Sequence, residues 1–72
     1  MPARVRPGWW HPPPDVGVSL FGFQEGYIVY VDGRDKTRGQ VYDPNSLADQ
    51  AKLIERLGED QARRVIEWML SN

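Results

Sequence analysis

The stretch VGVSLFGFQEGYIVYVD, residues 16–32, contains two runs of strand-forming residues separated by a short turn. The first run, residues 16–23, alternates with a period of two, so its aliphatic and aromatic side chains fall on opposite faces. Gly22 interrupts this run and indicates a bulge or a bend. The second run, residues 27–32, is β-branched or aromatic up to Val31 and is apolar on both faces. We therefore predict two antiparallel strands, the second of them central in its sheet.

A polar segment follows the second strand. Asp32-Gly33 is a strong signal for a two-residue hairpin turn, but such a turn needs strands directly beside it. Residues 34–38 are too polar for a buried strand. We therefore predict a longer, solvated hairpin loop, with the third strand at about residues 40–43 around Tyr42.

The C-terminal third of the chain has helical periodicity. Asn45 or Ser46 can cap a helix, and an apolar stripe follows at Leu47, Ala51, Ile54, Gly58, Ala62, Val65 and Met69. The stripe has no phase slip, which allows one long helix, whereas Gly58 followed by two acidic residues is typical of a stop and a restart. We favour two helices, at about 46–57 and 60–70. We expect the helical layer to be held mainly by Leu47, Ile54, Leu57, Val65, Ile66 and Met69.

Residues 1–14 contain five of the six prolines, which remove backbone donors and favour extended geometry. The predicted fold is α+β: a small three-stranded antiparallel sheet followed by one or two C-terminal helices packed on one face. An extended proline-rich arm, residues 1–14, precedes this single small domain, residues 15–72. Trp9 and Trp10 in the arm are costly to leave in water, so we expect the arm to contact either its own domain or a partner.

Composition excludes several classes of protein. The 72 residues are 40% hydrophobic and 26% charged, with a net charge of −1 and no cysteine. The missing cysteines exclude disulfides and thiolate zinc sites and fit a reducing compartment, so we expect a cytoplasmic protein. No segment approaches the roughly 18 apolar residues of a membrane span. His11 is the single histidine, and no nucleophile elbow or phosphate-binding loop is present, so we expect no enzyme, no metal and no cofactor.

The sequence has an excess of aromatic residues for so thin a fold. Helices can cover only one face of an antiparallel sheet, so the other face should carry exposed rings. We expect partner-binding residues at Trp9, Trp10, Phe21, Tyr30 and Tyr42. The predicted function is a small non-enzymatic protein-binding module, such as an inhibitor, adaptor or accessory factor, of a kind common among phage and mobile-element products. A homodimer is a further alternative.

The alternative function is nucleic-acid binding. Five cations recur at alternate positions, namely Arg34, Lys36 and Arg38 in the hairpin loop and Arg4 and Arg6 in the arm. Residues two apart in an extended segment point the same way, so each group can present its charges together. The order of three strands and a helix over residues 16–57 loosely resembles the arm-type DNA-binding domain of tyrosine integrases, in which the sheet enters the major groove. That resemblance implies DNA binding at the basic hairpin tip. Those domains are usually basic, whereas this chain is slightly acidic, so we prefer protein binding.

Overall fold

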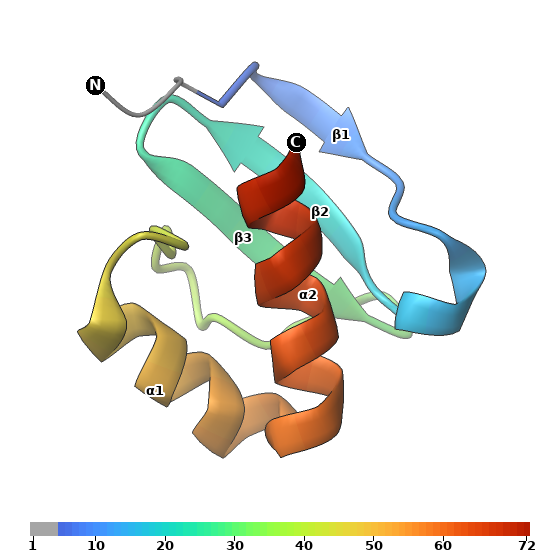
Figure 1. Ribbon diagram of the computed structural model, residues 1–72. Coiled ribbons are helices and arrows are strands. Elements are labelled where there is room, and N and C mark those ends of the chain that lie inside the picture. The colour runs from blue at the N-terminus through green and yellow to red at the C-terminus, as the bar shows by residue number, and fades with distance from the viewer. Residues whose placement is uncertain (1–4) are drawn as a thin grey trace.

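The computed structural model describes residues 5–72 and contains an antiparallel sheet followed by two helices, which confirms the α+β class (Figure 1). The sheet has four strands in the order β1-β2-β3-β4, where three were predicted. Their bounds are β1 Gly8–Trp10, β2 Ser19–Phe23, β3 Gly26–Val31 and β4 Arg34–Asp35. The additional strand is β1, which comes from the predicted arm and pairs with β2. Within residues 5–72, neither helix combines the length and hydropathy needed to cross a bilayer.

The central hairpin forms as the alternating pattern predicts. β2 and β3 pair from Ser19↔Tyr30 to Phe23↔Gly26, around a turn at residues 24–25. β2 begins at Ser19 rather than at Val16, because Pro14–Val16 forms a 3-10 turn, η1, that ends at Gly17 in the left-handed conformation (φ 77°). The expected bulge at Gly22 is absent, and this residue keeps regular pairing on both sides.

The third predicted strand was wrong in position. Asp32 (φ 51°) and Gly33 (φ 76°) both have positive φ, as a two-residue type I′ turn requires, and β4 follows directly. The polar residues of β4 are tolerated because this strand is short and lies at the sheet edge. Tyr42, expected inside a strand, forms only an isolated bridge with Tyr27, through two backbone hydrogen bonds of 2.9 and 2.7 Å.

Two helices follow, α1 Leu47–Leu57 and α2 Glu59–Ser71, in agreement with the two-helix alternative. The hydroxyl of Ser46 accepts a hydrogen bond from the backbone N–H of Asp49 and caps α1. Gly58 separates the helices with a positive φ of 87°, a conformation that glycine adopts without strain. Both helices lie on the same side of the sheet (Figure 1), and we call this covered side the inner face.

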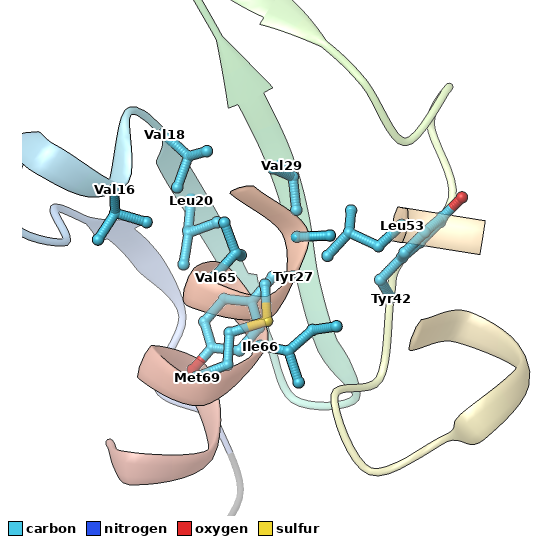
Figure 2. Packing of buried hydrophobic residues seen from close by; sticks show 11 residues of the cluster. Val16, Val18, Leu20, Tyr27, Val29, Tyr42, Leu53, Val65, Ile66 and Met69 are labelled. Atoms are coloured by element: carbon cyan, nitrogen blue, oxygen red, sulfur yellow. The ribbon is translucent and has the colours of Figure 1, made fainter. Parts of the chain in front are cut away.

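The core lies between the inner face and the helices (Figure 2). Its buried hydrophobic residues are Val16, Val18, Leu20, Tyr27, Val29, Tyr42, Leu53, Ala62, Val65, Ile66 and Met69. The expected inward residues of α2 are confirmed.

One expected inward residue of α1 was wrong, because Leu47 is 80% exposed. Ile54 and Leu57 are partly buried and pack against the core as predicted, and Leu53, which was not predicted there, is the buried residue of this helix. Two polar side chains orient α1. Asp49 accepts from the backbone N–H of Asp43, and the Gln50 side chain donates to the carbonyl of Pro44. These bonds direct the side of α1 that carries Asp49 and Gln50 toward the domain. Leu53 lies on the same side of the helix, because it is four residues after Asp49 and three after Gln50.

Candidate binding face

One face of the sheet is left without a helical cover, and we call it the outer face. Cross-strand partners share a face, so the pairs Trp9↔Phe21 and Phe21↔Ile28 place three large side chains in one row across β1, β2 and β3. Phe23 and Tyr30 lie on the same side, since they are two residues from Phe21 and Ile28 along their strands. The outer face is therefore defined by Trp9, Phe21, Phe23, Ile28 and Tyr30.

The aromatic rings of the outer face touch one another. The Trp9 ring meets Phe21 edge to face with centroids 5.1 Å apart and lies 5.3 Å from Tyr30 at a tilt of 52°. Phe21 in turn lies 5.2 Å from Phe23. Trp9 is 56% exposed, while the other outer-face residues are half-buried. The rings thus form one continuous apolar surface with Trp9 as its most prominent member.

Trp10 lies on the inner face and serves the fold. Its ring packs edge to face against Tyr27 and Trp68, with centroids 6.1 and 5.7 Å away. The indole Nε1–H donates to the carbonyl of Arg6 at 2.9 Å, and the Arg6 guanidinium stacks 4.9 Å from the ring centroid. Sequence reasoning grouped Trp10 with Trp9 as a partner-binding residue, but the two do not lie together.

Gly22 is the point where the N-terminal segment crosses β2. A Cβ atom built on Gly22 would lie 2.6 Å from the Arg6 carbonyl oxygen, 2.7 Å from Val5 and 2.8 Å from Trp10 Nε1. Real Cβ atoms do not approach other atoms so closely, so a glycine is required there for close backbone contact. Residues 5–10 therefore pack directly on their own domain.

Tyr42 belongs to the core, and its expected place on the free face was wrong. It is 2% exposed, and its hydroxyl has no hydrogen-bond partner among residues 5–72. The Arg56 guanidinium lies 5.6 Å from its ring centroid. Burial raises the pKa of Tyr42 and also that of Tyr27 above the ordinary value, so both phenols stay neutral at pH 7.

The cations of the predicted cluster lie on different elements. Arg34 is exposed opposite Val31, which packs against the core, so its strand position belongs to the helix-covered side. Lys36 and Arg38 lie in a turn, where residues two apart need not point the same way, and Arg38 has a φ of 54°. Arg6 is held by Trp10. Arg4 lies outside the described residues.

The turn after β4 is organised by one carboxylate that sequence reasoning did not single out. Asp35 accepts hydrogen bonds from the N–H and hydroxyl of Thr37, at 2.8 and 2.6 Å, and from the N–H of Gly39 at 2.8 Å. Partial desolvation pushes the pKa of Asp35 upward, but these bonds and one from the Arg38 N–H outweigh it, so the pKa lies below its ordinary value. The role of Asp35 is structural.

A hollow adjoins the outer face at the end where β2 begins and β3 ends. Its walls come from Trp9 and Tyr30, from the segment at His11 and Pro12, and from the turn at Asp32. Within residues 5–72, no three histidine, cysteine or carboxylate side chains come together as metal ligands. The side chains that line the hollow offer apolar contact, ring stacking, the imidazole of His11 and one carboxylate, that of Asp32.

Comparison of the chain with protein-family models, with curated proteins and with solved structures finds no match.

Proposed function

We propose that this protein is a small non-enzymatic protein-binding module that recognises its partner through the outer face, as an inhibitor, adaptor or accessory factor does. The observation that carries the proposal is the exposure of Trp9. Trp9 is 56% exposed, whereas the other two tryptophans of this small domain, Trp10 and Trp68, are partly buried and pack against the core. Tryptophan, tyrosine and arginine are the residues that most often supply the binding energy at protein interfaces.

The position of Trp9 on a paired strand strengthens the proposal. Binding costs free energy when a mobile segment must be ordered, and pairing of β1 with β2 has already ordered this one. The Phe21 and Tyr30 rings support the indole from the side and leave its remaining surface available. An aromatic anchor surrounded by half-buried apolar side chains is the arrangement expected at the centre of a binding site.

Charge favours protein over nucleic acid as the partner. None of the outer-face side chains is cationic, and Arg34 belongs by its pairing to the opposite side of the sheet. Nucleic-acid affinity depends chiefly on cations that neutralise phosphates. Stacking rings without adjacent cations are therefore a weak platform for a polyanion.

A selection experiment tests the proposal. The full chain is immobilised, a phage-displayed library of random peptides is selected on it, and each recovered peptide is measured against Trp9→Ala. We expect recovered peptides whose affinity falls about tenfold or more with Trp9→Ala, which corresponds to ~1.4 kcal/mol. Leu70→Ala is the matched control, because Leu70 is 52% exposed on α2 and lies away from the outer face. Recovered peptides that all depend on Leu70 and none on Trp9 would contradict the proposal.

A further inference from the structure

The hollow beside the outer face has a distinctive combination of walls. Trp9 and Tyr30 supply aromatic surface, Pro12 and His11 also line the hollow, and Asp32 lies at the turn between β3 and β4. Among the described residues that line the hollow, Asp32 is the only one with a carboxylate, and none is a lysine or an arginine. The hollow is therefore apolar and aromatic, with a single negative charge.

The carboxylate of Asp32 is free to receive a ligand. It is exposed, and within residues 5–72 it takes part in no hydrogen bond or ion pair, the only salt bridge there being between Arg63 and Glu59. Arg34, two residues further on, is exposed and does not reach it. The turn needs no carboxylate at this position, because asparagine before glycine suits a type I′ turn equally well. The negative charge of Asp32 is thus unused by the fold.

We propose that this hollow binds a cationic side chain, arginine in preference to lysine, from an extended segment of the partner protein. The inference rests on the proposed function and adds the chemistry of the partner. A guanidinium is attracted to the faces of tryptophan and tyrosine, and its planar fork pairs with a carboxylate. The ring centroids of Trp9 and Tyr30 are 5.3 Å apart, and Asp32 lines the same hollow. One arginine side chain of the partner can therefore touch both rings and reach toward the Asp32 carboxylate.

Surface area favours a peptide segment over a second copy of this chain. Trp9 is 56% exposed and the other four outer-face residues are half-buried. With about 150–250 Å² for a whole aromatic side chain, the outer face offers on the order of 300–400 Å², against roughly 800 Å² per partner in a stable interface. A short segment needs only such a limited surface, whereas a homodimer would have to recruit much more.

The peptide selection described above also tests this inference, when it is repeated on Asp32→Asn and on Glu25→Gln. Asp32→Asn removes the charge and preserves the turn. Glu25→Gln removes an equal charge at the opposite end of β3 and is the matched control. Among peptides that depend on Trp9, we expect arginine and lysine to be enriched at least fivefold over the unselected library. The enrichment should persist on Glu25→Gln and vanish on Asp32→Asn.

The outcomes separate the two proposals. Peptides that depend on Trp9 but show no enrichment in cations, or the same enrichment on Asp32→Asn, overturn the cation site and leave the protein-binding proposal standing. If no peptide depends on Trp9, both proposals fail. Two further results also overturn the cation site: a dimer in sedimentation equilibrium that Trp9→Ala dissociates, and Trp9-dependent binding of single-stranded oligothymidine that weakens steeply with salt.

Discussion

Trp9 and Trp10 are adjacent in the chain, yet their side chains lie on opposite faces of the sheet. Trp9 contacts Phe21 and Tyr30 on the outer face, while Trp10 is packed between Tyr27 and Trp68 on the inner face. The alternation of a β-strand is the cause, because successive side chains point to opposite sides. Pairing of β1 with β2 thus divides one sequence motif into a structural residue and a surface residue.

This division predicts different costs of replacing the two tryptophans. Trp10→Ala should destabilise the protein by about 3 kcal/mol, because it removes two ring contacts and leaves a cavity. Trp9→Ala should cost less than about 1 kcal/mol, since more than half of its side chain is already in water. Urea unfolding followed by far-ultraviolet circular dichroism measures both values. If Trp10→Ala fails to fold, Trp10→Phe provides the comparison. Equal costs for the two alanine variants would show that the strand is wrongly placed.

Gly22→Ala should displace the N-terminal segment from the domain. The added methyl group would overlap with the Arg6 carbonyl and Trp10 Nε1, and overpacking of this kind costs about 1–3 kcal/mol. The expected signature in a 15N–1H spectrum is a shift of the Trp10 indole signal together with loss of protection at Gly8–Trp10. Ser19→Ala in the same strand is the control and should change neither. A spectrum of Gly22→Ala that matches the wild type would refute the close crossing.

Leu53 should be the most sensitive position of α1. Leu53→Ala should reduce the free energy of unfolding by about 2–4 kcal/mol, as for other buried leucines. Leu47→Ala, at an exposed position of the same helix, should change it by less than about 0.5 kcal/mol. Thermal melting of the two variants distinguishes them. A larger effect at Leu47 than at Leu53 would place Leu47 on the inward side of α1, as the sequence pattern predicted.

Asp35 should make stability depend on pH in the acidic range. Its pKa is lowered in the folded protein, so the stabilisation is fully present above the unfolded value of about 3.9. It is lost as the pH falls from there through the lower folded pKa. The wild type should therefore be more stable than Asp35→Asn at pH 6, with a difference that shrinks toward pH 2. Urea unfolding of both proteins across this range is the measurement. A difference that is independent of pH would mean that the carboxylate charge contributes nothing.

The sequence was sufficient where local pattern and tertiary structure agree. The β2–β3 hairpin follows from the alternation of apolar side chains along the two strands. The break between the helices follows from Gly58, because a glycine followed by two acidic residues is typical of one helix ending and another beginning. The separation of Leu20 from Phe21 and Phe23 across the sheet was also predictable, and it located part of the outer face.

The remaining features depend on contacts that no local pattern contains. β1 forms because Gly22 has no side chain to block residues 5–10 where they cross β2. The sequence of residues 1–14 has no alternating pattern that would predict a strand. The orientation of α1 depends on two hydrogen bonds with the preceding loop, one that Asp49 accepts from the Asp43 N–H and one that Gln50 donates to the Pro44 carbonyl. Asp32-Gly33 signals the two-residue turn, but the polar residues after it argue against a buried strand, and only the edge position of β4 explains why they are tolerated.

The indole N–H signals of the three tryptophans provide one measurement that covers both faces. A 15N–1H spectrum is recorded during hydrogen exchange, and again with a peptide recovered by the selection on the wild type. We predict that the Trp10 signal is protected by its bond to the Arg6 carbonyl and does not respond to the peptide. The Trp9 signal should exchange fastest and shift on peptide addition, together with the amides of Phe21, Ile28 and Tyr30. A protected Trp9 signal, or peptide-induced shifts confined to α1 and α2, would contradict the assignment of the outer face as the binding surface.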